Sequence, residues 1–172
     1  MAKLTLREAR RADARAIAEI HVAAWRAAYR DLMPQSYLDS LSIEERARMW
    51  EKTIAHPGPA HLALADVDGE LAAFCLYGPT RDRLQENVAE IYAVNVHPAR
   101  WRQGAGALLC AHALHEAAAR EHSAMTLWVM SGNGRARRFY QHLGFAPDGA
   151  ARTNTQLIGS PFDEVRYRKA IA

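Results

Sequence analysis

Lysine and cysteine are scarce in this 172-residue sequence, and long apolar runs are missing. No lysine lies between Lys52 and Lys169, so a Walker loop, which needs a Gly-Lys-Ser/Thr sequence, is excluded there. Cys75 and Cys110 form no Cys-x-x-Cys pair or His/Cys metal spacing, which indicates two buried thiols in a reducing compartment. No apolar run approaches the roughly 20 residues of a membrane span, and the N-terminus lacks a signal-like stretch. We therefore expect a soluble, cytoplasmic protein without a membrane partner.

The charge is nearly balanced, and arginine supplies most of its positive side. The 19 arginines and 3 lysines face 19 acidic residues, which gives a formal net charge of +3. This modest charge, without a basic stripe carrying aromatic platforms, argues against a nucleic-acid partner. Guanidinium groups suit planar phosphate or carboxylate partners instead. The length and the 49% hydrophobic content predict one domain over residues 1–172.

Apolar spacing and turn residues predict a mixture of strands and helices. Asp13 is the expected N-cap of the first helix, and Ser42 with Glu45 forms a capping box for the second. Asp68-Gly69 predicts a β-hairpin. Strands are expected over 3–9, 61–78 (as the hairpin), 88–96, 124–130, 152–159 and 163–171. Helices are expected over 14–30, 42–55 and 106–120, with a short one ending before Gly144. Hairpins together with helical crossovers predict an α/β (α+β) fold with a partly antiparallel sheet.

The segment "VHPARWRQGAGALLCAHAL", residues 96–114, joins a buried strand to a helix through a glycine turn. Gly104 and Gly106 let the backbone approach a bulky diphosphate and adopt positive φ, and a helix start directs free N–H groups at an anion. A dinucleotide fingerprint fails because Leu109 occupies its third glycine position. Five arginines are candidates for further phosphate contacts: Arg100, Arg102, Arg135, Arg137 and Arg138.

Residues 90–106 and 126–145 together resemble the GCN5-related N-acetyltransferase (GNAT) superfamily. The matching residues are Val96, Pro98, Gly104 and Gly106 in the first segment, and Asn133, Ala136, Phe139, Tyr140, Gly144 and Phe145 in the second. "HVAAWRAAYRDLMP" near the start and "EVRY" near the end look like features of one bacterial branch of the family. Trp101 stands where Arg or Gln is usual, and Arg102 where Gly is frequent.

The resemblance implies a single-domain, three-layer α-β-α fold with a mixed, mostly antiparallel sheet whose two parallel strands splay apart at an acetyl-CoA site. The pantetheine arm would run along the strand at Val94 and Val96, and an N–H near Val94 or Asn95 would polarise the thioester carbonyl. Asn133 would orient the arm or the loop. Backbone amides would hold the diphosphate at Arg102, Gln103, Gly104, Ala105, Gly106 and Ala107.

The implied activity is direct acetyl transfer to a primary amine of a small metabolite or peptide. Tyr140 is the family's candidate for protonating the departing thiolate. Glu90 is the first candidate for the base, on a strand face that it would share with Tyr92 and Val94, and His21 is the second, with water as a third option. The alternative is a non-catalytic module that senses CoA or another phosphate ligand.

The acceptor is expected to bind among residues 21–38, 78–88 and 155–165. The stripe His21, Trp25 and Tyr29 either packs at a helix edge or lines this pocket. Acidic candidates for attracting a cationic acceptor are Asp148, Asp163 and Glu164. A metal site is not expected, because His112 and His115 have no further ligands beside them. Cys110 has no activating neighbour, so we do not expect it to act as a nucleophile. The sequence leaves open whether the protein forms a homodimer.

Overall fold

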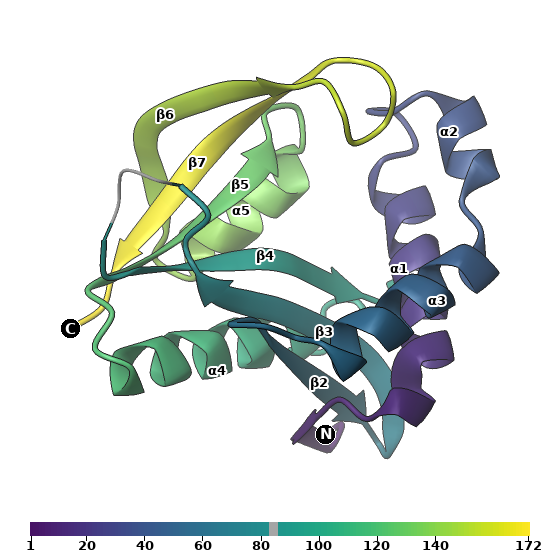
Figure 1. Ribbon diagram of the computed structural model, residues 1–172, viewed down its shortest axis with the longest axis horizontal. Helices are drawn as coiled ribbons and strands as arrows, with labels where there is room; N and C mark the ends of the chain where they lie inside the picture. Colours follow the sequence, from purple (N-terminus) through teal and green to yellow (C-terminus); the bar gives the residue numbers. More distant parts are fainter. Residues whose placement is uncertain (83–85) are drawn as a thin grey trace.

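The computed structural model describes residues 1–82 and 86–172 and contains a seven-stranded sheet with helices on both faces (Figure 1). The strand order is β1-β2-β3-β4-β5-β7-β6, and β4 with β5 is the parallel pair. The strands are β1 Leu4–Glu8, β2 His61–Val67, β3 Glu70–Pro79, β4 Val88–Val96, β5 Ala124–Met130, β6 Ala146–Asn154 and β7 Phe162–Ala170. The α-helices are α1 Ala14–Ala28, α2 Gln35–Ser40, α3 Ile43–Ala55, α4 Ala105–Ala119 and α5 Gly134–His142.

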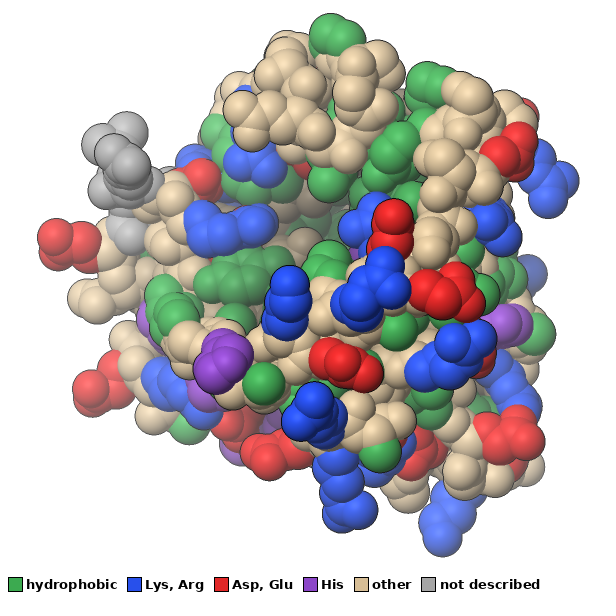
Figure 2. Space-filling view, turned by 45° about the vertical axis from the view of Figure 1, so that its right-hand side comes forward, with side chains coloured by type: hydrophobic (Ala, Val, Ile, Leu, Met, Phe, Trp, Pro, Cys, Tyr) green, Lys and Arg blue, Asp and Glu red, His purple; other side chains and the backbone are tan. Residues whose placement is uncertain are grey.

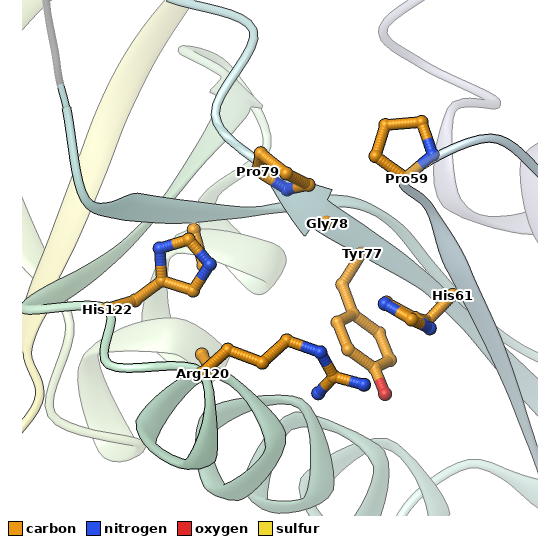
Figure 3. A pocket seen from close by; sticks show the side chains of 9 residues that line it. Pro59, His61, Tyr77, Gly78, Pro79, Arg120 and His122 are labelled. Atoms are coloured by element: carbon orange, nitrogen blue, oxygen red, sulfur yellow. The ribbon is translucent and has the colours of Figure 1, made fainter.

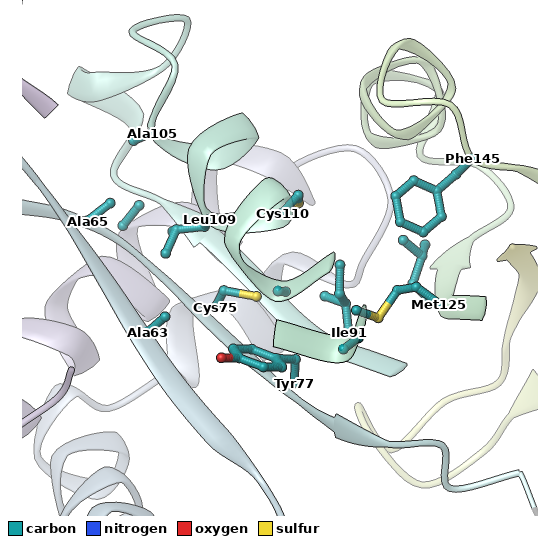
Figure 4. Close-up of a cluster of buried hydrophobic side chains, with 14 of the residues drawn as sticks. Ala63, Ala65, Cys75, Tyr77, Ile91, Ala105, Leu109, Cys110, Met125 and Phe145 are labelled. Atoms are coloured by element: carbon teal, nitrogen blue, oxygen red, sulfur yellow. The ribbon is translucent and has the colours of Figure 1, made fainter. Parts of the chain in front are cut away.

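Two apolar clusters hold the helices against opposite faces of the sheet. On one face, α4 buries Leu109 and Cys110 against β3, β4 and β5, and Figure 4 shows both side chains above Cys75 and Ile91. On the other face, α1 and α3 pack against Phe74 and other side chains of β2 and β3. The three-layer α-β-α arrangement and the mostly antiparallel sheet are as expected.

Several local predictions are confirmed by the structure. The β2–β3 hairpin turns at Asp68 and Gly69, which have φ values of 54° and 84°. Ser42 caps α3, because its Oγ accepts a hydrogen bond from the Glu45 N–H at 3.2 Å. Gly144, just after α5, has a φ of 86°, as a helix-terminating glycine requires.

Two local predictions differ from the structure. Asp13 is the residue before α1, as expected, but its side chain does not cap the helix, because its carboxylate binds the Arg7 guanidinium and the Arg10 N–H. The strand expected over 152–159 instead spans Ala146–Asn154, since β6 is an exposed edge strand whose position is set by pairing with β7. Among the described residues, no helix is long and apolar enough to cross a membrane.

Candidate active site

The two parallel strands separate part-way along their length. Pairing runs from Val88 with Ala124 to Ile91 with Leu127, and no further β4–β5 pairs are formed in the described structure. On its other side β4 stays paired with β3 up to Val96, with a bulge opposite Leu76 and Tyr77. The remainder of β4 therefore has a free edge directed at a gap.

Backbone direction shows which groups face this gap. The His97 N–H donates to the Ala72 carbonyl at 2.8 Å, so positions 95 and 97 bond to β3, while Val94 and Val96 turn toward the gap. Asn95 therefore cannot polarise a group bound there, whereas the Val94 N–H can. The Trp101 indole N–H donates to the Val96 carbonyl at 2.8 Å. The Val96 N–H and both polar groups of Val94 therefore face the gap.

The glycine turn after β4 has the conformation that the sequence predicts. Gly104 precedes α4 with a φ of 91°, and Arg102 has a φ of 63°, where the family often has glycine. The Leu108 N–H makes the first bond of the helix, to the Gly104 carbonyl at 3.0 Å. The N–H groups of 105–107 therefore project from the helix start, and the first turn holds no acid to repel an anion.

Gly106 brings the two motifs together. A Cβ at this position would lie 3.3 Å from Val96 Cγ2 and 3.3 Å from Phe139 Cζ, so glycine permits close packing of β4, α4 and α5. Arg135, at the start of α5, stacks over the Trp101 ring with its Cζ 3.3 Å from the ring centre. Trp101 thus links the loop to α5 instead of supplying the side-chain contact of the usual arginine.

Two of the five candidate arginines are engaged elsewhere. Arg137 donates to the Tyr167 hydroxyl and to the Ser131 carbonyl, both at 3.0 Å, and Arg100 pairs with Glu70. Their expected phosphate contacts are therefore not supported. The structure keeps the other three near the turn or on α5: Arg102, Arg135 and Arg138.

Tyr140 lies on α5 and packs its ring against Phe139 and Phe145, with centroid separations of 5.1 and 6.0 Å. Burial raises the pKa of its hydroxyl well above the ordinary value of 10.0, and the nearby Cys110 and Tyr29 add to the rise. The hydroxyl is therefore protonated at neutral pH and can act only as a donor of its proton.

Asn133, Tyr29 and Glu164 come together beside Tyr140. Asn133 caps α5 by accepting from the Ala136 N–H at 3.0 Å, which fixes the loop before this helix. Burial raises the pKa of the Tyr29 hydroxyl, a hydrogen bond with Asn133 lowers it, and the Glu164 carboxylate raises it. In the sequence, Tyr29 stood out only as part of a helical stripe. Its proximity to Glu164 on β7 depends on the tertiary structure and could not be predicted from neighbouring residues.

Glu90 is buried, with 1% of its surface exposed, and both carboxylate oxygens are occupied. The Arg81 N–H donates to Oε2 at 2.8 Å, and the Arg81 Nη2 donates to Oε1 at 2.6 Å. Arg81 also covers the Tyr92 ring at 4.4 Å, so Glu90 and Tyr92 do share a neighbour. Val94 instead joins the cluster beneath α4, with Ile91, because the bulge shifts the alternation of β4.

His21 belongs to the core. Its side chain is 8% exposed, and its Nδ1 accepts a hydrogen bond from Trp50 Nε1 at 3.2 Å, which places the ring proton of the neutral form on Nε2. Burial, with a smaller contribution from Arg46, lowers its pKa to about 4. Neither nitrogen is therefore free to take a proton from an acceptor amine.

The segments expected to bind the acceptor include α1, α2 and the β6–β7 connection, which arches toward α2 in Figure 1. The Tyr37 hydroxyl donates to the Leu157 carbonyl at 3.3 Å and ties these segments together. In Figure 2 the molecule is hollowed below its upper part, with hydrophobic side chains in the hollow. The remaining segment expected to bind the acceptor is 78–88, and its residues 83–85 lie outside the described structure.

This geometry matches that of known acetyltransferases. The model of the acetyltransferase (GNAT) family matches residues 7–145. The chain belongs to the GNAT acetyltransferase family. It is similar to the uncharacterized N-acetyltransferase YuaI of Bacillus subtilis (strain 168), with 32% identity over 94% of this chain and 90% of YuaI. GNAT enzymes are acyltransferases, and so is this protein.

Two further comparisons bear on fold and ligand. A mycothiol acetyltransferase of Acidimicrobium ferrooxidans is 33% identical over 64% of this chain and 34% of its own length. The solved structure of paia N-acetyltransferase from Thermoplasma acidophilum, in complex with coenzyme A, has a TM-score of 0.73 and 18% identity, over 98% of this GNAT chain and 99% of its own.

Two cavities lie away from the glycine turn, near the opposite end of α4. One of about 60 Å³ lies among His61, Tyr77, Arg120 and His122, as Figure 3 shows. A more open one of about 370 Å³ shares the first three of these and extends to the ends of β1 and α3. Within 1–82 and 86–172, no group of three or more His, Cys, Asp or Glu residues is arranged to hold a metal ion.

Proposed function

We propose that the protein is an acetyl-CoA-dependent N-acetyltransferase that acts on a primary amine in the cytoplasm. The observation that carries this proposal is the divergence of β4 from β5 before the glycine turn, with Tyr140 packed against the same apolar cluster as Val94 and Val96. A relative of this fold is solved with coenzyme A, and mycothiol acetyltransferases match part of the chain.

The residues present fit coenzyme A. Positive φ at Arg102 and Gly104 turns successive amides outward, and the absent Cβ of Gly106 lets the start of α4 pack closely against Val96 and Phe139, next to the free edge of β4. The amides of 102–107 would hold the diphosphate, and Arg135, which stacks on Trp101 beside the turn, would contact a further phosphate. Val94 and Val96 offer an extended edge to the amides of the pantetheine arm.

Bound acetyl-CoA supplies an acetyl group activated as a thioester. The Val94 N–H donates to the carbonyl oxygen and stabilises the charge that develops there as the amine nitrogen bonds to carbon. As the carbon–sulfur bond breaks, Tyr140 gives its proton to the sulfur. The amine loses a proton to a carboxylate or water. Water is the proposed acceptor of this proton, because Arg81 holds both oxygens of Glu90, the first candidate from the sequence.

The test is thiol release from acetyl-CoA with a panel of amines, amino acids and peptides. Tyr140→Phe should lower kcat by about 10²–10⁴-fold without weakening CoA binding, because only the proton donor is removed. Tyr77→Phe is the matched control and should keep wild-type kcat. Tyr77 is a buried tyrosine on β3, and its hydroxyl lies 3.5 Å from His112 Nε2. CoA binding with no thiol release from any acceptor would favour the sensor.

A further inference from the structure

Three acidic side chains were candidates for attracting an acceptor, and the structure separates them. Asp148 uses both oxygens, accepting from Arg166 Nε at 2.7 Å and from the Ala150 N–H at 3.0 Å. Asp163 is exposed and accepts from the Thr153 hydroxyl at 2.8 Å. Neither faces Tyr140.

Glu164 differs from both. It is 8% exposed, and its Oε2 accepts from Arg152 Nε at 2.7 Å. Among the described residues, Oε1 accepts no hydrogen bond, whereas both oxygens of Glu90 are taken by Arg81. Glu164 is therefore a largely buried carboxylate with one oxygen available.

The sheet places this oxygen on the acceptor side. Glu164 lies opposite Met130 in the β5–β7 pairing, and its neighbour Val165 packs toward α4 on the other face. Met130 belongs to an apolar cluster that includes Tyr29 and Phe162. Tyr29 lies near both Glu164 and Tyr140. The Glu164 carboxylate raises the pKa of Tyr29, and Tyr29 raises the pKa of Tyr140. Glu164 therefore lies on the same face of the sheet as Met130, whose cluster includes Tyr29.

Glu164 has both charged and aromatic neighbours. Arg152 pairs with it and also lies over the Trp128 ring at 4.0 Å, while Tyr29 belongs to a row of packed aromatic rings. The rings of Trp25 and Tyr29 lie 5.1 Å apart, and those of Trp25 and Tyr37 lie 6.5 Å apart. Aromatic faces beside a carboxylate stabilise an ammonium and exclude highly hydrated groups. They also suit an apolar body attached to that ammonium.

We propose that Glu164 receives the ammonium group of the acceptor, and that the acceptor is a primary monoamine on a compact apolar or aromatic body. The ammonium pairs with Oε1 while Arg152 keeps Oε2. This assignment rests on the proposed N-acetyltransferase function, and it gives Glu164 a role in binding the acceptor, before any proton is removed.

The experiment combines kinetics and binding, with phenethylamine as the probe. Glu164→Gln should raise the KM for phenethylamine about tenfold or more, because an ionic hydrogen bond becomes a neutral one, and leave the KM for acetyl-CoA within about twofold. Asp163→Asn, the adjacent acid on the exposed side of the strand, is the matched control and should change neither. Glu164→Asp, which keeps the charge, should give a smaller rise and serves if Glu164→Gln does not fold.

Calorimetry on the CoA-saturated protein provides a readout that needs no turnover. Phenethylamine should bind wild type about tenfold or more tightly than Glu164→Gln, whereas the neutral 2-phenylethanol should bind both equally. Equal phenethylamine affinity in wild type and variant, no phenethylamine binding, or clear preference for the polyamine spermidine would overturn the proposal. Wild type that binds phenethylamine through Glu164 but releases no thiol would refute the proposed function alone.

Discussion

Acidification should destabilise the protein through His21, and the effect can be measured. The ring is buried against Trp50 and Phe74, and burial, followed by the charge of Arg46, lowers its pKa from 6.5 to about 4. The unfolded chain therefore binds a proton near pH 6.5, but the folded chain binds it only near pH 4. Stability from this group is complete above pH 6.5 and is lost as the pH falls toward 4.

The size of the loss follows from the two pKa values. A change from 6.5 to about 4 corresponds to about 3 kcal/mol over the whole window, at about 1.4 kcal/mol for each tenfold change in proton affinity. Between pH 7.5 and pH 5 the expected loss is about 2 kcal/mol. Urea unfolding, followed by tryptophan fluorescence at both pH values, measures it.

A variant isolates this contribution from that of the acidic residues. His21→Gln keeps a hydrogen-bond acceptor for Trp50 but does not titrate, so its loss between pH 7.5 and 5 should be about 2 kcal/mol smaller than that of wild type. His115→Gln, at an exposed position of α4, should behave like wild type. Equal losses in wild type and His21→Gln would refute the reasoning.

Three further predictions concern the glycine turn and the buried thiols. Gly104→Ala should lower the free energy of unfolding by about 1–2 kcal/mol in urea and weaken CoA binding, because its φ is 91°. Arg102→Gly should raise the free energy of unfolding by up to about 1 kcal/mol, since a φ of 63° strains arginine, and a lower urea midpoint would contradict this. Burial raises the pKa of both cysteine thiols, that of Cys110 to about 12. A thiol reagent at pH 8 should therefore label Cys75 and Cys110 only when the protein unfolds, and rapid labelling of the native protein would disprove this prediction.

The sequence predicts those elements whose signal is local. The strands at 88–96 and 124–130 have the predicted bounds, because buried parallel strands are continuous apolar runs. β6 carries Pro147 and Gly149 on an exposed edge, where pairing with β7 and not composition decides its position. The six-residue helix α2 was missed because it is too short for an apolar periodicity.

The same distinction holds for the candidate site. The glycine turn and Tyr140 lie in motifs that can be identified from sequence. The contact of Arg81 with Glu90 depends on how β3 pairs with β4, and the placement of Glu164 depends on how β5 pairs with β7, so neither could be predicted. From the sequence, His21 was a candidate for the base. The structure argues against this role, because Trp50 Nε1 donates a hydrogen bond to His21 Nδ1.

The central claim is that the amides after Trp101 hold coenzyme A beside the free edge of β4. Titration calorimetry of coenzyme A into the folded protein tests it most directly. Saturable one-to-one binding in the micromolar range, weakened by Gly104→Ala, is the predicted result. No heat of binding at millimolar coenzyme A would contradict the account.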